Sequence, residues 1–220
     1  MTRVLIIDDH PIVLQGCRRV LQDAGVADVL EADSMVGGYR LYRRNLPDVV
    51  VIDLGLQGGG LGGLELISRM RRNDDRLPIL VFTMHSDAVI VSRALKAGAT
   101  GYVLKDAGPK DFLEAFEAVR RCRPYLSHQL AMQVALLGTP GSNSDLIQAT
   151  PRELQTLALL AQGKPYTQIA DDLGVSYKTV ANTSSQLKAK LGARNLPELI
   201  RMAIQYFSSA SRYDAENRPV

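Results

Sequence analysis

The stretch "VVVIDLGLQGGGLGGLEL", residues 49–66, decides the fold. Four consecutive apolar residues precede an acid, and a glycine-rich loop then leads into a segment whose apolar residues recur at helical spacing. An apolar run without polar alternation is typical of a strand that is buried on both faces of a parallel sheet. The stretch therefore predicts one strand, loop and helix unit of an α/β fold.

The same unit recurs throughout residues 1–122. Apolar runs predict five strands at 3–8, 28–33, 48–53, 78–84 and 101–105, and each is followed by a segment with apolar residues three and four apart. Strands that alternate with helices predict a parallel sheet with helices on both faces. We therefore expect an α/β domain at 1–122, with a doubly wound five-stranded parallel sheet.

The rest of the chain is helical in pattern. We expect a linker at 123–149, in which a short helix precedes a Gly/Pro/Ser-rich stretch. Thr150 and Glu153 have the spacing of a capping box, which predicts that a helix begins there. A small all-α helix-turn-helix domain is expected at 150–208, followed by a flexible tail at 209–220.

Composition excludes several classes of protein. The chain has 220 residues with a net charge of +3, and its two cysteines lack any C-x-x-C spacing, which argues against a zinc site or a disulfide framework. It contains no run of about 18 apolar residues, and its N-terminus meets two acids and a proline before a signal-peptide core could form. We expect a soluble, cytoplasmic protein that does not bind membranes.

Polar side chains follow the expected strands. Asp8 and Asp9 end the first strand, Asp53 the third, Thr83 the fourth and Lys105 the fifth. Open α/β sheets bind ligands at the carboxyl ends of their strands. Three carboxylates placed together repel one another unless a cation lies among them, and oxygen donors favour Mg2+. We expect Asp53 to form an aspartyl phosphate, with the metal and Lys105 neutralising the phosphoryl oxygens and Thr83 donating a hydrogen bond.

The glycine-rich loop allows a second interpretation. Gly58, Gly60 and Gly63 have the G-x-G-x-x-G spacing of a dinucleotide-binding turn. Such a turn directly follows the first strand, and an acid at the end of the next strand binds the ribose. Here the glycines follow the third strand, and the next strand ends at Thr83. The sequence therefore argues against nucleotide binding.

Two sets of motifs resemble known domains. "VLIIDDHPIV", "VVVIDL", "GLELI", "ILVFTMHSD" and "ALKAGATGYVLKDA" are similar to the CheY-like receiver domain. "TPRELQTLALLAQGKPYTQIADDLGVSYKTVANTSSQLKAKLGA" is similar to the LuxR-type helix-turn-helix. Together they resemble a two-component response regulator of the NarL/FixJ family, with a receiver domain at 1–122 and a LuxR-type domain at 150–208.

The resemblance implies a role for each residue of the site. Asp53 is the phosphoacceptor. Mg2+ is held directly by Asp9, largely through water by Asp8, and also by Asp53 and the backbone carbonyl of Gly55. The residues that sense the phosphoryl group and switch the domain are Thr83, Lys105 and Tyr102, the last by a change of rotamer.

The loop after Asp53 departs from the family pattern. Relatives usually have a tight "DLxMPGxxGLE" turn, whereas "DLGLQGGGLGGLE" lacks the proline and is longer. Residues 53–56 stay in register, so we expect phosphoacceptance to be retained. His85, two residues after Thr83, either tunes hydrolysis of the phosphoryl group or is a solvated loop residue.

The third helix of the second domain has one apolar and one polar face. An inward stripe of Val180, Ser184, Leu187 and Leu191 is expected, and a tight turn before this helix favours major-groove binding by the opposite face. The residues expected to contact DNA are Lys178, Thr179, Ala181, Asn182, Thr183, Ser185, Gln186, Lys188 and Lys190.

This face differs from that of the family it resembles. Family members commonly carry lysines at the positions of Ala181 and Ser185 and a histidine at Thr183, and all three positions are uncharged here. We therefore expect direct base readout by Asn182, with Gln186 beside it. Asparagine and glutamine pair best with the N6 and N7 edge of adenine.

These observations predict a phosphorylation-controlled, DNA-binding transcription regulator. Its expected partners are a sensor histidine kinase, double-stranded DNA and a second copy of itself, since one small domain buries limited surface on DNA. Catalysis is expected only in its own phosphorylation and dephosphorylation. One alternative is an aspartyl-phosphate phosphatase, although such sites need an acid at Gly55. The other is a receiver interaction module whose DNA-binding domain is not functional.

Overall fold

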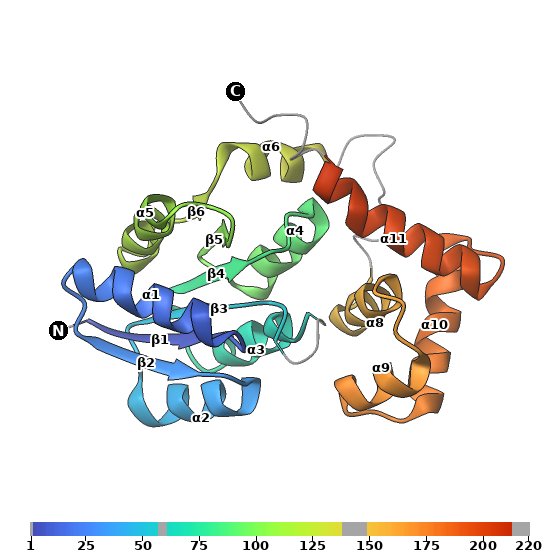
Figure 1. The fold of residues 1–220 in the computed structure, drawn as a ribbon, viewed down its shortest axis with the longest axis horizontal. Coiled ribbons are helices and arrows are strands. Elements are labelled where there is room, and N and C mark those ends of the chain that lie inside the picture. Colours follow the sequence, from blue (N-terminus) through green and yellow to red (C-terminus); the bar gives the residue numbers. More distant parts are fainter. Residues whose placement is uncertain (1, 57–60, 138–148, 213–220) are drawn as a thin grey trace.

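The structure is a computed structural model that describes residues 2–56, 61–137 and 149–212. Its first part is a parallel sheet between two layers of helices, and its second part is a small helical bundle (Figure 1). The fold class expected from the sequence is confirmed. Part of the glycine-rich loop, the Gly/Pro/Ser-rich linker stretch and the end of the expected tail lie outside the described residues.

The sheet has six strands in the described ranges, one more than expected. They are β1 (Arg3–Ile7), β2 (Asp28–Ala32), β3 (Val49–Ile52), β4 (Ile79–Thr83), β5 (Gly101–Leu104) and β6 (Tyr125–Leu126). Their order is β2-β1-β3-β4-β5-β6, and every neighbouring pair is parallel. The additional strand corrects our prediction: β6 pairs Tyr125 with Gly101 and Leu126 with Tyr102. Two residues are too few to show a strand period in the sequence.

Helices cover both faces of the sheet (Figure 1). One face carries α1 (Pro11–Asp23) and α5 (Pro109–Arg120), and the other carries α2 (Met35–Asn45), α3 (Gly62–Arg71) and α4 (Ala88–Ala97). The strand side chains between these layers are almost all buried, and each fully buried aliphatic side chain stabilises the fold by roughly 1.5–3 kcal/mol. The strand ends that carry the polar residues are therefore held by a dense core.

The second part of the chain begins on the sheet and ends in a helical bundle. The expected linker helix, α6 (His128–Leu136), follows β6 and packs against α4. The bundle consists of α8 (Pro151–Ala161), α9 (Tyr166–Leu173), α10 (Tyr177–Leu191) and α11 (Leu196–Arg212). Because α11 continues to Arg212, the first residues of the expected tail are helical.

Local signals fix the ends of these helices. Thr150 Oγ1 accepts a hydrogen bond from Glu153 N at 3.2 Å, and Glu153 Oε2 accepts one from Thr150 N at 2.6 Å, which confirms the predicted capping box. Gly174 ends α9 at φ +61°, in the left-handed region that favours glycine. Ser176 Oγ then accepts from Thr179 N at 3.1 Å and starts α10. The result is a helix-turn-helix.

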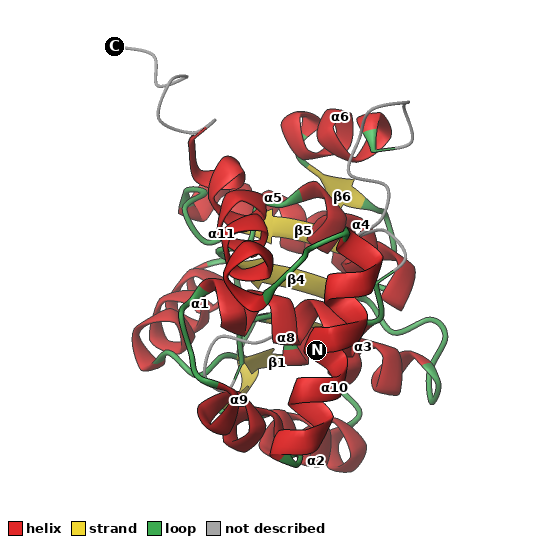
Figure 2. Cartoon of the chain, turned by 90° about the vertical axis from the view of Figure 1, so that its right-hand side faces the viewer, coloured by secondary structure: helices red, strands yellow, loops and turns green. Residues whose placement is uncertain are grey.

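The two parts of the molecule touch through α3 and α8 (Figures 1 and 2). A hollow between them is lined by Glu65, Ser68, Arg72, Arg152, Gln155 and Leu173. Within the described ranges, no helix combines the length and the apolar character needed to cross a membrane.

Candidate functional site

An acidic cluster lies at the carboxyl ends of β1 and β3. Asp8 directly follows β1 and Asp53 directly follows β3, and a hydrogen bond from Asp53 N to Ile7 O at 2.9 Å holds the two ends together. Asp8 and Asp53 are buried, whereas the Asp9 side chain is partly exposed. One ligand atom from each of Asp8, Asp9, His10 and Asp53 lies within 4.8 Å of the others. The three acids predicted to meet are together.

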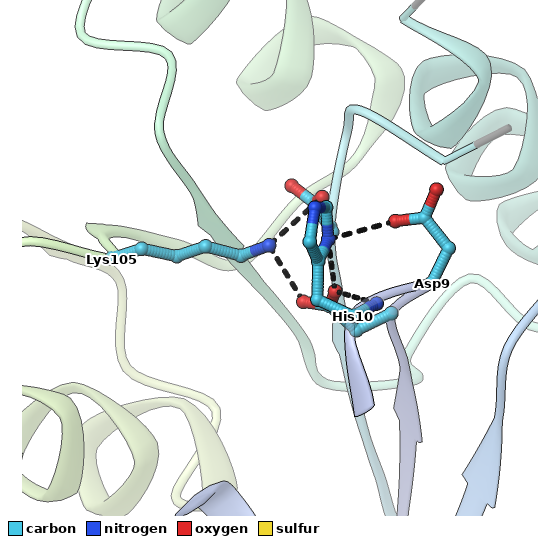
Figure 3. Close-up of polar contacts among 5 residues, drawn as sticks. Asp9, His10 and Lys105 are labelled. Carbon is cyan, nitrogen blue, oxygen red and sulfur yellow. Dashed lines mark hydrogen bonds and ion pairs between the residues drawn. The ribbon is translucent and has the colours of Figure 1, made fainter. Parts of the chain in front are cut away.

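Lys105 reaches this cluster from the end of β5. Its Nζ atom is 2.7 Å from Asp8 Oδ2 and 3.0 Å from Asp53 Oδ2, on the side away from Asp9 (Figure 3). Burial alone would lower the pKa of Lys105. The hydrogen bonds and charges of Asp8 and Asp53 outweigh that effect and raise the pKa above its ordinary value. The ammonium group therefore stays charged and compensates part of the negative charge of the cluster.

His10 contacts two carboxylates of the same cluster (Figure 3). Its Nδ1 atom is 3.1 Å from Asp8 Oδ1 and 3.0 Å from Asp9 Oδ1. The His10 side chain is 65% exposed, so its movement disturbs no core packing. A cation that entered the cluster would compete with this imidazole for the same two carboxylate oxygens.

Two buried oxygens of the site have no hydrogen-bond partner in the part of the chain that the structure describes. They are Asp53 Oδ1 and Thr83 Oγ1. Buried polar atoms are nearly always hydrogen-bonded, so such atoms mark a position where a ligand is expected. The carboxylate oxygens of Asp8, Asp9 and Asp53 are the kind of ligand atom that a hard divalent cation prefers. The cluster can therefore hold a metal ion, and one carboxylate oxygen remains available.

Tyr102 joins β5 to the loop after β4. Its side chain is fully buried, and its hydroxyl donates a hydrogen bond to the backbone carbonyl of His85 at 2.7 Å. Desolvation raises the pKa of Tyr102 well above its ordinary value, and the charges of Asp87 and Asp53 raise it further. The phenol therefore stays protonated and remains a donor.

The ring of His85 is half-buried beside Gly55 and Asp53. A methyl group built at Gly55 would lie 3.9 Å from His85 Nε2 and 3.3 Å from Asp53 Oδ2, so the glycine leaves the space between imidazole and carboxylate open. Burial lowers the pKa of His85, and the opposing charge of Asp53 does not cancel this effect. A neutral imidazole thus lies next to the carboxylate at neutral pH.

Gly63 has a packing role rather than a nucleotide-binding one. A methyl group on this residue would lie 2.4 Å from the backbone oxygen of Asp53 and 2.7 Å from Leu54 Cα. Gly63 N donates to Leu54 O at 3.2 Å, which fixes the start of α3 against the end of β3. The other two glycines of the G-x-G-x-x-G pattern, Gly58 and Gly60, lie outside the described residues.

The predicted DNA-reading face of α10 is at the surface. The inward stripe is buried at Val180, Ser184 and Leu187, as predicted, and Leu191 is partly buried. Four of the predicted contact residues are exposed, and their side chains form no hydrogen bond or ion pair with other described residues: Lys178, Asn182, Ser185 and Gln186. Ala181 and Lys188 are partly buried on the same helix.

Three other predicted contact residues already have partners within the domain. Thr183 Oγ1 donates to Thr179 O at 2.9 Å, and Thr179 Oγ1 lies 2.9 Å from Ser176 Oγ. Lys190 Nζ is 2.7 Å from Glu153 Oε2. Because Glu153 is almost completely buried in the capping box of α8, its carboxylate draws Lys190 toward α8.

Two protein families match this chain. The response regulator receiver domain matches residues 4–117, and the luxR family of bacterial regulatory proteins matches residues 148–203. The chain belongs to the response regulators. With this pair of domains it is of the NarL/FixJ type, a phosphorylation-controlled, DNA-binding transcription regulator.

Relatives of this response regulator match it along nearly their whole length. The methanol utilization control regulatory protein MoxX of Paracoccus denitrificans is 42% identical over 93% of this chain and 92% of its own. The transcriptional activator protein ExaE of Pseudomonas putida is 35% identical, over 92% of this chain and 95% of its own. RcsB from Salmonella enterica serovar Typhimurium was solved bound to promoter rprA with the phosphomimetic BeF3-. It is 28% identical to this chain with a TM-score of 0.68, and the match covers 94% of this chain and 98% of the RcsB chain.

The response regulator also has a hollow between its two domains that sequence reasoning missed. Glu65 and Ser68 of α3 line the same hollow as Arg152 and Gln155 of α8. No pattern in the sequence connects these residues, because their meeting depends on how two domains pack together. The hollow is therefore visible only in the folded chain.

Proposed function

We propose that this response regulator accepts a phosphoryl group on Asp53 from a sensor histidine kinase, and that phosphorylation controls DNA binding by α10. The observation that carries the proposal is the difference between the two carboxylate oxygens of Asp53. Oδ2 is 3.0 Å from Lys105 Nζ, whereas Oδ1 is buried without a partner among the described residues. One oxygen is held, and the other is available as a nucleophile.

The transfer is a displacement at phosphorus. An oxygen of Asp53 attacks the phosphorus of a kinase phosphohistidine, a P–O bond forms, and the P–N bond breaks with its electron pair going to the imidazole nitrogen. Lys105 stabilises the negative charge on the phosphoryl oxygens, and the hydroxyl of Thr83 donates a hydrogen bond to one of them. Hydrolysis of the acyl phosphate then restores the Asp53 carboxylate.

Asp8, Asp9, Asp53 and the backbone carbonyl of Gly55 would hold Mg2+. When bound, the ion neutralises part of the charge on the phosphoryl oxygens. The residues suit such an ion, because Lys105 supplies one positive charge to three carboxylates. His10 leaves its two carboxylate contacts when the ion enters.

The switch residues are Thr83, Lys105 and Tyr102. A phosphoryl group on Asp53 attracts Thr83, which ends β4, and the loop after Thr83 contains His85. Because Tyr102 donates to His85 O, movement of this loop releases or redirects the tyrosine ring. The signal thereby reaches β5 and α4.

DNA binding is assigned to α10 in a domain that spans 150–208, joined by a linker at 123–149 to a receiver domain at 1–122. Lys178 and Lys188 contact phosphates, and Asn182 with Gln186 reads base edges. Support comes from the RcsB relative, which was solved bound to a promoter. We propose a homodimer on two half-sites in the cytoplasm, with no catalysis beyond phosphorylation and dephosphorylation of Asp53.

The full chain tests both halves of this proposal. After incubation with acetyl phosphate and Mg2+, intact mass spectrometry is expected to show one phosphoryl group on the wild type and none on Asp53→Asn. The exposed acid Asp33, changed to Asn, serves as the control and is expected to leave phosphorylation intact. Selection of bound genomic fragments is expected to recover an operator that is enriched after phosphorylation. A phosphoryl group on Asp53→Asn would contradict phosphorylation of Asp53. Recovery of no DNA by the folded protein would contradict DNA binding.

A further inference from the structure

One surface of the receiver domain carries arginines without acidic partners. These exposed residues of α2, α3 and the loop after α3, here called the arginine face, are Arg40, Arg43, Arg44, Arg69, Arg72 and Arg76. None of them forms an ion pair with a carboxylate of the described ranges. The receiver arginines that do form such ion pairs lie on β1, α1 and α5 or directly after α5: Arg3, Arg18, Arg19, Arg120 and Arg121. Six positive charges that are unpaired within the described ranges therefore lie on one surface, while the exposed Lys96 and Lys110 lie apart on α4 and α5.

Two of these guanidinium groups are held in place by one polar network that contains no carboxylate. Arg43 Nη1 donates to Asn73 Oδ1 at 3.0 Å, and Asn73 Nδ2 donates to the hydroxyl of Tyr39 at 3.2 Å. The guanidinium carbon of Arg69 lies 3.9 Å from the centroid of the Tyr39 ring. The network joins α2 to α3, so the arginines of both helices belong to one surface.

The network also affects the tyrosine at its centre. Desolvation raises the pKa of the Tyr39 phenol. Hydrogen bonds from Arg69 and Asn73 and the positive charges of Arg69 and Arg43 outweigh this, so the pKa is lowered. The surface around Tyr39 is thus positive in potential, which favours an anion.

The acids of the same segments do not neutralise the arginine face. Glu65, Asp74 and Asp75 are its exposed acids, three negative charges against six positive ones. Asp74 Oδ1 already accepts hydrogen bonds from the backbone N–H groups of Arg76 and Leu77. A planar guanidinium group binds phosphate oxygens through two parallel hydrogen bonds, so a row of them fits a phosphate backbone.

The helix-turn-helix domain, by contrast, offers few cations to DNA. Of the seven bases between Arg152 and Arg201, Lys164, Lys190 and Arg201 are in ion pairs. Arg152 is held by the backbone oxygen of Leu173 at 2.6 Å. The bases that remain are Lys178, Lys188 and Arg194. Because phosphate contacts supply much of the affinity for duplex DNA, three cations per protomer are a weak basis for binding.

The arginine face lies on the same side of the molecule as the helix-turn-helix, and Met35 at the start of α2 lines one pocket together with Leu173 and Gly174 at the end of α9. Figures 1 and 2 both place α2 in the lower part of the molecule together with α9 and α10. The first helix of a helix-turn-helix crosses the DNA backbone, so a duplex bound at α9 and α10 runs along this side. We propose that the arginine face binds the phosphate backbone of the duplex that flanks the operator. The inference rests on the proposed DNA binding by α10.

The test compares two duplexes that carry the operator recovered by genomic selection. One is limited to the two half-sites, and the other is extended by about two helical turns on each side. We expect phosphorylated wild-type protein to bind the extended duplex at least tenfold more tightly. The triple variant Arg40→Gln, Arg43→Gln, Arg44→Gln is expected to lose this preference and to bind the short duplex like wild type. The slope of log affinity against log salt on the long duplex is expected to become shallower by about one for each phosphate that the variant no longer neutralises.

Matched variants separate this effect from net charge and from folding. The triple variant Arg19→Gln, Arg120→Gln, Arg121→Gln removes the same charge from α1 and from the end of α5, and it is expected to keep the preference for the long duplex. The double variant Arg40→Gln, Arg44→Gln leaves the Arg43 network intact and is expected to lose most of the preference. The proposal is overturned if the control variant loses the preference for the long duplex to the same extent, or if the arginine-face variants keep it. The arginine face would then be assigned to binding an acidic protein. Failure of wild type on both duplexes would instead contradict DNA binding by α10.

Discussion

The hydroxyl of Tyr102 donates a hydrogen bond to the backbone carbonyl of His85 across 2.7 Å. The bond joins a core residue of β5 to the loop that begins just after Thr83. The same loop brings the neutral ring of His85 next to Asp53. The site and the centre of β5 are thus connected through one tyrosine.

Removal of this hydroxyl has a predictable effect on stability. Tyr102→Phe keeps the ring in the core but leaves the His85 carbonyl without its donor, which is expected to lower the free energy of unfolding by about 1–3 kcal/mol. Urea unfolding followed by circular dichroism measures the change. Tyr125→Phe is the control, because the Tyr125 hydroxyl has no hydrogen-bond partner in the described ranges. Equal losses in both variants would show that the bond contributes nothing.

Gly63 is expected to tolerate no side chain. In Gly63→Ala the new methyl group must move the backbone of Asp53 or the start of α3, at a cost of about 1–3 kcal/mol in the free energy of unfolding, and phosphorylation by acetyl phosphate is expected to slow. Gly16→Ala on α1 meets no atom within 4 Å and is expected to be neutral or stabilising. The prediction fails if the two variants unfold at the same urea concentration.

Asp9 is expected to contribute directly to metal affinity. Asp9→Ala removes one carboxylate from the cluster while the buried Asp8 and Asp53 remain, so Mg2+ affinity is expected to fall by about tenfold or more. Calorimetric titration of the unphosphorylated full chain measures this, with Asp33→Ala as control. Unchanged affinity in Asp9→Ala would place the ion elsewhere.

Glu153 is expected to make the free energy of unfolding of the second domain depend on pH. Burial raises the pKa of this carboxyl, but the hydrogen bonds from Lys190 and from Thr150 outweigh it and bring the pKa below its ordinary value of 4.5. A group with a lower pKa in the folded state stabilises the fold above its unfolded pKa and loses that effect as pH falls through the folded pKa. The ion pair is therefore fully effective at neutral pH, and its contribution is lost in acid, as the pH falls from the ordinary pKa of 4.5 through the lowered pKa of the folded state.

The comparison is between wild type and Glu153→Gln in urea unfolding from about pH 7 to about pH 3. The variant is expected to be less stable at neutral pH, and the two are expected to converge in acid. A constant difference across the whole range would show that the Glu153 charge is not responsible.

Substitutions on α10 are expected to distinguish the residue that reads a base from the residue that contacts phosphate. Asn182→Ala is expected to relax the preference at one adenine by about 1–3 kcal/mol and to leave other positions unchanged. Lys188→Ala is expected to weaken all sequences alike and to flatten the salt dependence. Single-base operator variants measured at two salt concentrations decide this. If Asn182→Ala weakens every operator equally, Asn182 contacts the backbone.

Much of the receiver site was predictable from sequence, because parallel strands bring their carboxyl ends to one edge. That rule alone placed Asp8, Asp53 and Lys105 together, and the structure puts Lys105 within 3.0 Å of both acids. The rule carries no information on side-chain direction, so the inward position of Tyr102 and the approach of His85 to Gly55 needed the folded chain.

Other features depend on contacts between distant segments. Lys190 and Glu153 are 37 residues apart in the sequence. The helical pattern predicted that Lys190 contacts DNA, but it could not show that this lysine forms an ion pair with Glu153 in the capping box of α8. The six arginines of α2, α3 and the following loop were visible in the sequence. Their lack of acidic partners was not, because pairing is a property of the surface.

The short strand β6 also determines how far the two domains can separate. Leu126 pairs with Tyr102 on β5, and α6 begins two residues later and packs on α4, so the chain stays attached to the receiver up to the end of α6. From Leu137 to Ala149 there are twelve peptide links, a maximum reach of about 40 Å. The proposed dimer can therefore use only operators whose half-sites place each DNA-binding domain within about 40 Å of the end of its own α6.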